Sequence, residues 1–201
     1  MKKILTALVV ATGLLLSGCS NVDAALTLGD TKVTTAELQA NADVILAERA
    51  KVDTTQMQLE TGENLLRNLL QFRVLLAGFA EIGKDLDVQI TSSEIAARRA
   101  EIVDQVGGAE SLPTALVSAS IAPADLDGYI RAILVSNKLS QALVQSGVAE
   151  ADVEGRVQQL LVAKLNELKI EINPRYGKWD AITGQIVAAT AAGDAVTPSN
   201  E

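Results

Sequence analysis

Apolar residues recur along the chain at helical spacing, and the densest such pattern covers residues 62–83, GENLLRNLLQFRVLLAGFAEIG. Apolar side chains would cover most of the circumference of this helix. A helix with so little polar surface is either surrounded by other elements or inserted in a membrane. Arg67, Gln71 and Arg73 fall in its middle, where a membrane-spanning helix would carry them at high cost. We therefore predict the central helix of a soluble helical domain.

Two further helices begin with the same start signal. Thr34 and Thr91 are each followed three residues later by a glutamate, which is the capping-box arrangement. The first helix is predicted to run from Thr34 to about Lys51. The second is predicted to run from Thr91 to about Val106, where the glycine pair at 107 and 108 ends it.

Three more helices are predicted toward the C-terminus, over residues 110–118, 123–143 and 150–168. Pro123 would occupy the first position of the second of these, where a missing backbone N–H does no harm. Gly83 is predicted to be the C-terminal cap of the central helix, because glycine is the usual residue there. Its context GFAEIGKD resembles a phosphate-binding loop only superficially, since Asp85 stands where a hydroxyl would bind magnesium.

Alternating segments near both ends predict short strands. Residues 25–33, ALTLGDTKV, predict a strand pair broken at Gly29 and Asp30, and residues 169–174, KIEINP, predict a strand ended by proline. Strands at both ends with helices between them predict a mostly α domain. We expect five to six helices, closed by a small antiparallel sheet from the N- and C-terminal strands. Residues 184–201 are rich in Ala, Thr, Gly, Pro and Ser, which predicts a flexible tail.

The first residues, MKKILTALVVATGLLLSGCS, have the three parts of an export signal: two lysines, an apolar run and small residues. The apolar run is short for a membrane span. Leu16-Ser-Gly-Cys19 resembles a bacterial lipobox, which implies that Cys19 becomes lipidated after cleavage. The predicted organisation is a lipoprotein signal peptide over 1–18, a lipidated tether over 19–24, a helical domain over 25–183 and the tail. The localisation that follows is the extracytoplasmic side of a membrane, held by the lipid anchor.

Composition narrows the function. The chain has a net charge of −8, which becomes −10 when the two leader lysines are removed, so we expect no nucleic-acid partner. It contains no histidine and one cysteine, which excludes Ser-His and Cys-His nucleophile pairs, histidine-ligated metals and an internal disulfide. We therefore expect no enzyme activity, no cofactor and no metal. The sequence carries no signal for an oligomeric state.

Three passages together resemble the chaperone domain of the SurA and PrsA foldases, exported proteins of the parvulin type. They are LTLGDTKVTTAEL at residues 26–38, ITSSEI at 90–95 with the later APADL at 122–126, and INPRYGKWD at 172–180. The first passage resembles the family's opening strands and capped helix, and the second resembles the starts of its later helices. The third resembles the family's closing strand with its Asn-Pro-Arg-aromatic-Gly turn. The resemblance covers most of residues 25–180.

The chain departs from that family in one respect. Many members insert a prolyl isomerase domain of about a hundred residues between the long helix and the closing helix, where this chain has only residues 146–151. So short a segment forms no independent domain. The resemblance therefore implies a membrane-tethered holdase that binds unfolded or partly folded exported proteins without isomerase activity.

The predicted client-binding surface is a groove between the central helix and the helix that carries Tyr129, with Phe72, Leu76 and Phe79 on the central helix as the other candidates. Phe72 and Phe79 are seven residues apart on one side of the predicted helix, and such an aromatic pair is more often part of a core than of a binding surface. The alternative function is a lipoprotein adaptor or scaffold that binds one specific envelope partner through a single defined interface.

Overall fold

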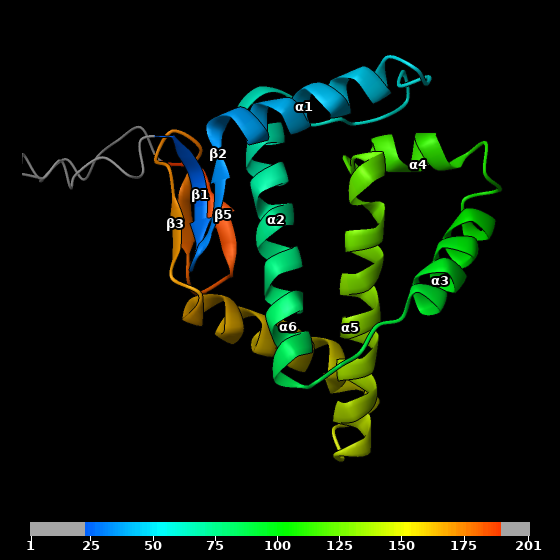
Figure 1. Ribbon diagram of the computed structural model, residues 1–201, viewed down its shortest axis with the longest axis vertical. Coiled ribbons are helices and arrows are strands. Elements are labelled where there is room, and N and C mark those ends of the chain that lie inside the picture. The colour runs from blue at the N-terminus through cyan, green and yellow to red at the C-terminus, as the bar shows by residue number, and fades with distance from the viewer. Residues whose placement is uncertain (1–22, 190–201) are drawn as a thin grey trace, which may run out of the picture.

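The computed structural model describes residues 23–189 (Figure 1). Within them the α-helices are α1 (Thr35–Arg49), α2 (Gly62–Asp85), α3 (Ser92–Gln105), α4 (Leu112–Ala119), α5 (Leu126–Gln145) and α6 (Glu150–Glu167), and a 3-10 turn η1 (Pro123–Asp125) precedes α5. The strands are β1 (Ala24–Leu28), β2 (Thr31–Thr34), β3 (Ile170–Ile172), β4 (Lys178–Asp180) and β5 (Gln185–Val187). The predicted mostly α fold class is confirmed.

The predicted closing sheet is a three-stranded antiparallel sheet in the order β2-β1-β3. Leu26 of β1 lies opposite Val33 of β2 on one side and Ile172 of β3 on the other. The two ends of the domain are thus joined by backbone hydrogen bonds. Asn173 strengthens this junction, because its backbone N–H donates to Ala25 O at 3.0 Å and its side-chain amide donates to Ala24 O at 3.0 Å. The domain therefore begins at Asp23 or Ala24, one or two residues earlier than the predicted boundary at 25.

The prediction of a flexible tail from residue 184 is wrong at its start, because Gln185–Val187 form β5 and pair with β4 in a second, two-stranded sheet. Ile186 is buried against the core. Gln71 of α2 holds this segment through both ends of its amide, accepting from Ile186 N at 2.7 Å and donating to Gly184 O at 3.1 Å. The remainder of the predicted tail, residues 190–201, lies outside the described residues, as do the leader and Cys19.

α2 and α5 stand side by side in the middle of the molecule, with α1 crossing one end of α2 and α6 crossing near the other (Figure 1). The small sheets flank α2, and α3 lies on the far side of α5. This placement explains why α2 is apolar on most faces: it contacts α1, α5, α6, β1 and β5. The prediction that α2 is the central helix is confirmed.

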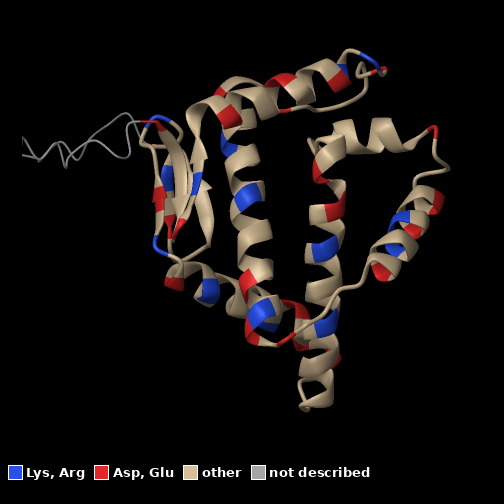
Figure 2. Ribbon diagram, viewed as in Figure 1, with Lys and Arg blue, Asp and Glu red and all other residues tan. Residues whose placement is uncertain are grey.

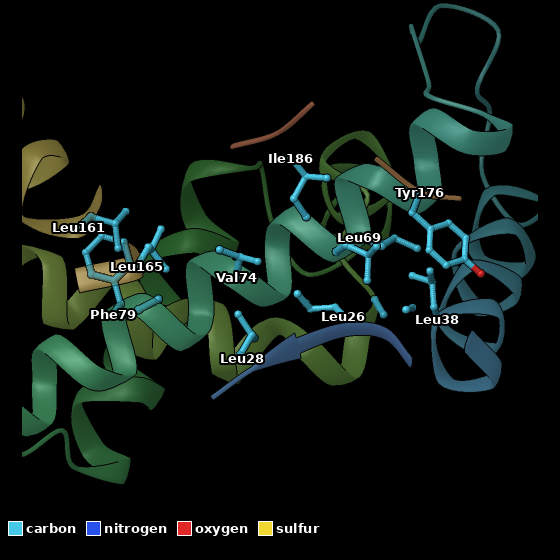
Figure 3. Packing of buried hydrophobic residues seen from close by; sticks show 14 of the residues in the cluster. Leu26, Leu28, Leu38, Leu69, Val74, Phe79, Leu161, Leu165, Tyr176 and Ile186 are labelled. Atoms are coloured by element: carbon cyan, nitrogen blue, oxygen red, sulfur yellow. The ribbon is translucent and has the colours of Figure 1, made fainter. Parts of the chain in front are cut away.

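The main core cluster joins both sheets to α1, α2, α5 and α6 (Figure 3). Leu26, Leu70 and Val74 have essentially no exposed surface within it. A second cluster gathers apolar residues of α2, α3, α4 and α5. Every buried member of both clusters lies between Ala25 and Ile186, so a form without the leader, residues 20–201, retains the packing that stabilises the domain.

Both capping boxes form as predicted. The backbone N–H of Glu37 donates to Thr34 Oγ1 at 3.1 Å, and that of Glu94 donates to Thr91 Oγ1 at 3.2 Å. Each glutamate carboxylate in turn accepts from the backbone N–H of its threonine, at 2.7 Å and 2.8 Å. Two local signals thus fix the starts of α1 and α3.

Gly83 is not the cap of α2, which is a correction to the prediction. The helix continues to Asp85, and the residue in the left-handed conformation after it is Asp87, with φ of 50°. Gly83 instead faces α5, where an added Cβ would lie 3.3 Å from Val135 Cγ2. Gly78 plays the same part toward α6, since a Cβ there would lie 2.6 Å from Leu161 Cδ1. Both glycines allow close approach of a neighbouring helix.

Candidate binding groove between two helices

An open hollow of about 410 Å³ lies between the C-terminal half of α2 and the first half of α5. The connector from α2 to α3 forms its third wall. The lining residues are Leu76, Phe79, Ala80, Gly83 and Lys84 of α2, Asp87, Val88, Gln89 and Ile90 of the connector, and Gly128, Arg131, Ala132 and Val135 of α5. We call this hollow the α2–α5 groove. It lies between the two helices for which the sequence predicts a client-binding groove.

Small residues of both helices line the groove: Ala80 and Gly83 of α2, and Gly128 and Ala132 of α5. Gly128 of α5 is exposed and would place a Cβ 3.6 Å from Leu76 Cδ1 of α2, which is ordinary contact distance. Ala80 on α2 is also exposed. Small side chains leave backbone and neighbouring apolar carbons accessible, so apolar surface contributes to the lining beside the polar residues.

The four predicted client-binding residues divide into two pairs. Leu76 and Phe79 line the α2–α5 groove, but Phe79 is only 8% exposed and belongs to the main core. Phe72 and Tyr129 pack against each other, with ring centroids 6.1 Å apart, in the second apolar cluster. The structure therefore brings Leu76 and Phe79 to the groove and places Phe72 and Tyr129 in a separate contact that helps to hold α2 against α5.

The groove residues that the sequence analysis missed are mainly those of the connector and the polar rim. Arg131 donates to Ile90 O at 3.3 Å, and Lys138, further along α5, donates to Gln89 O at 2.9 Å. These contacts hold the connector against α5 and so fix the third wall. Glycines at 83 and 128 were visible in the sequence, but Gly83 faces Val135 and Gly128 faces Leu76, and these contacts depend on a helix pairing that local patterns do not specify.

A partly buried polar junction fixes the N-terminal end of α5 relative to α1 and α2. Arg73 forms a two-pronged ion pair with Asp125, with Nη1–Oδ1 and Nη2–Oδ2 both at 2.9 Å. Asn41 of α1 donates to the same carboxylate at 3.4 Å. The Asn41 amide of α1 and the Arg73 guanidinium of α2 thus both bind the Asp125 carboxylate of η1. These contacts orient the start of α5, which lines the groove further along.

Outside this junction, acidic and basic residues are interspersed over the helices (Figure 2). Lys164 illustrates the arrangement: it pairs with Asp85 at 2.6 Å and with Glu167, and these hydrogen bonds raise the pKa of its ammonium group. The pair with Asp85 links α6 to the end of α2. Exposed pairs of this kind orient elements more than they stabilise them.

Glu94 has the strongest local electrostatic environment near the groove. Its carboxylate binds Lys138 Nζ at 2.7 Å and also accepts from the backbone N–H and hydroxyl of Thr91. The hydrogen bond from Lys138, followed by those from Thr91, lowers the pKa of Glu94 from 4.5 to about 2. This carboxylate therefore caps α3 and attaches α3 to α5 at the same time.

The pH dependence of this attachment follows from the sign of the pKa shift. Because the folded-state pKa is below the ordinary value, the contribution to stability is present above about pH 4.5 and is lost as pH falls toward 2. A carbon-detected NMR titration is expected to place the Glu94 midpoint near 2. In Lys138→Met the midpoint should move up toward 4.5, and an unchanged midpoint in that variant would show that Lys138 is not the main cause.

Among residues 23–189, no helix combines the length and apolarity needed to cross a bilayer. Nor does this part of the chain bring together three potential ligands that could hold a metal ion. Comparisons with family models, with curated proteins and with solved structures found no match to the chain.

Proposed function

We propose that this protein is a lipid-anchored holdase on the extracytoplasmic side of a membrane, which binds unfolded or partly folded exported proteins without catalysis. The observation that carries the proposal is the α2–α5 groove, an open hollow between two long helices whose lining combines apolar side chains with polar ones. A concave surface that combines apolar side chains with a few polar groups suits apolar segments of many sequences. The resemblance of residues 25–180 to the SurA and PrsA chaperone domain supports the same role.

The anchor rests on the lipobox, whose Cys19 lies four residues before Asp23, the first described residue. Four extended residues span at most about 14 Å. The domain would therefore stay close to the membrane surface, where exported chains emerge. The proposed role is non-catalytic. The chain has no histidine, and Asp87 is the one carboxylate among the residues that line the groove, so the groove offers no pair of acid and base groups.

The first test is aggregation suppression by residues 20–201 toward several unrelated, chemically unfolded proteins at stoichiometric ratio. The proposal predicts protection of more than one client, because an open groove has little shape selectivity. Circular dichroism on the same sample establishes that the protein is folded. Failure of the folded protein to protect any client would overturn the holdase proposal.

The groove is tested by Ala80→Glu, which introduces a carboxylate into the groove wall four residues before Lys84 and so suits the helix. An apolar client segment would then face a charge that has to be desolvated, so we expect client affinity to fall about tenfold. Ala151→Glu on α6 is the matched control, because Ala151 is also an exposed helical alanine but lies outside the groove. Fluorescence anisotropy with a labelled unfolded client gives both affinities, and equal losses in the two variants would place binding elsewhere.

A second candidate function, an adaptor for one envelope partner, is favoured by a different feature. Ile182 lies in the turn between β4 and β5 and is 90% exposed, far more than any other large apolar residue that the structure describes. A single protruding apolar side chain suits a specific interface better than general client binding. Under the adaptor function, Ile182→Ser would abolish binding to that partner and Ala80→Glu would leave it unchanged.

A further inference from the structure

α3 is attached to α5 by two ion pairs that are far apart on α5. Glu94 binds Lys138 at 2.7 Å, and Arg99 binds Asp127 at 2.5 Å. Asp127 and Lys138 are eleven residues apart, which is three helical turns, so both lie on the same side of α5. α3 therefore lies along one stripe of α5, with one ion pair near each end of the contact.

Apolar residues of α5 occupy the stripe between these ion pairs. Ile130 and Leu134 fall three and seven residues after Asp127, so they lie on the same side of the helix. Both belong to the second apolar cluster, together with Ile95 and Ile102 of α3. Ile130 is fully buried. We call Ile130 and Leu134 the covered stripe, because α3 lies over it.

The contacts that hold α3 in place are few. Ile95 is the one residue of α3 that is buried, and the rest of the helix is half-buried or exposed. The Arg99–Asp127 ion pair is also exposed, at 40% and 59% of the two side chains. Exposed ion pairs contribute little to stability. A helix with so few buried apolar contacts opens locally at much lower free energy than the core helices.

Non-helical segments flank α3 at both ends. Asp87, in the connector before it, has φ of 50°, and Gly107 and Gly108 after it have φ of 94° and 108°. Residues 88–91 form neither helix nor strand. α3 is thus a rigid rod between two non-helical joints. The connector also borders the α2–α5 groove, where Ile90 both lines the groove and packs on the second cluster.

We propose that α3 is a displaceable cover, and that an apolar segment of an unfolded polypeptide binds the covered stripe in its place. This inference rests on the proposed holdase function and extends the binding site from the groove to Ile130 and Leu134. The cover indicates what the stripe accepts. α3 presents Ile95 and Ile102 seven residues apart with Glu94 opposite Lys138 and Arg99 opposite Asp127, so a preferred client segment has two apolar residues two helical turns apart and an acidic residue beside the first.

The test uses residues 20–201, which contain no cysteine because Cys19 is the single cysteine of the chain. The loosened variant is Arg99→Ala with Asp127→Ala, which removes both partners of an exposed pair and leaves no charge unpaired. We expect it to raise the open population of α3 about two- to fivefold. Its matched control is Glu48→Ala with Lys51→Ala, an ion pair at the end of α1 and away from α3, in which Lys51 is exposed and Glu48 is half-buried.

The locked variant is Arg99→Cys with Asp127→Cys, joined by a short bis-maleimide, and the same protein capped with a mono-maleimide is its control. Hydrogen exchange of the α3 amides and binding of the dye bis-ANS report opening directly, without any client. We expect both to increase in the loosened variant and to decrease in the locked one, relative to their controls. Client affinity should change in the same directions.

Each outcome separates this inference from the proposed function. If the α3 amides exchange as slowly as those of α2 and α5 and neither variant differs from its control, the displaceable cover is refuted. If opening changes as expected but the locked protein binds clients as tightly as its control, the groove alone is the client site and this inference is refuted while the holdase function stands. If opening changes but no variant binds any client, both proposals fall.

Discussion

Gly177→Ala is expected to lower the free energy of unfolding by about 3 kcal/mol, which makes it one of the two most damaging single substitutions that we identify. Gly177 has φ of 146°, a conformation that residues with a side chain rarely adopt. A Cβ at this position would lie 2.4 Å from Val187 O, a backbone atom that has no rotamer with which to yield. The substitution therefore strains residue 177 and pushes β5 away from β4.

Urea denaturation followed by circular dichroism measures this loss, and Gly155→Ala is the matched control. Gly155 lies inside α6 with open space around the position of an added Cβ. Alanine has a higher helix propensity than glycine, so the control is expected to gain up to about 1 kcal/mol. The same chemical change should thus have opposite signs at the two sites. A Gly177→Ala protein as stable as the parent would show that β5 does not pack on β4 as described.

Leu70→Ala is expected to lower the free energy of unfolding by about 3 kcal/mol as well, through a different mechanism. Leu70 is in the middle of α2, fully buried in the main core where both sheets and four helices meet. Alanine removes apolar contact and leaves a cavity that the rigid α2 cannot collapse to fill. For a domain of this size the thermal midpoint should fall by about 6 to 12 °C.

Leu46→Ala is the control for the cavity effect. Leu46 is also a helical leucine, but it lies on the outer side of α1 and is 48% exposed. Its truncation leaves no cavity, so we expect a change below about 1 kcal/mol. Scanning calorimetry on both variants compares the two midpoints. Similar shifts would indicate that α2 is not the centre of the core.

The sequence was sufficient to predict helices and strands where local signals and the pattern of burial agree. Thr34 and Thr91 start their helices as predicted because a capping box involves only four consecutive residues. The alternation in residues 25–33 and 169–174 predicted β1, β2 and β3, although β1 is buried along most of its length and only β3 alternates between half-buried and exposed residues. The apolar surface of α2 likewise predicted a helix surrounded by others.

Predictions failed where a residue is determined by a distant partner. Residues 184–187 have a tail-like composition, yet β5 forms because Gln71, more than a hundred residues earlier, binds its backbone. Gly83 has the local context of a helix cap, yet it faces Val135 inside a helix. In both cases local propensity was overruled by a tertiary contact.

The candidate site also combines a feature that the sequence predicted with features that depend on distant contacts. The sequence placed a groove between α2 and the helix of Tyr129, and a hollow does lie between these two helices. It did not predict which residues line that hollow. Phe72 and Tyr129 pack on each other, whereas Gly128, Arg131 and the connector form the walls.

The sequence by itself thus determined the elements: which segments are helical, where capped helices begin, and which strands close the domain. Short-range hydrogen bonds and the periodicity of burial encode these features within a few residues of one another. Only the tertiary structure decided how α2 meets α5, that β5 belongs to the domain, and that α3 is attached to one stripe of α5. Those features depend on which surfaces far apart in the chain fit together, and that fit is set by the packing of the whole domain.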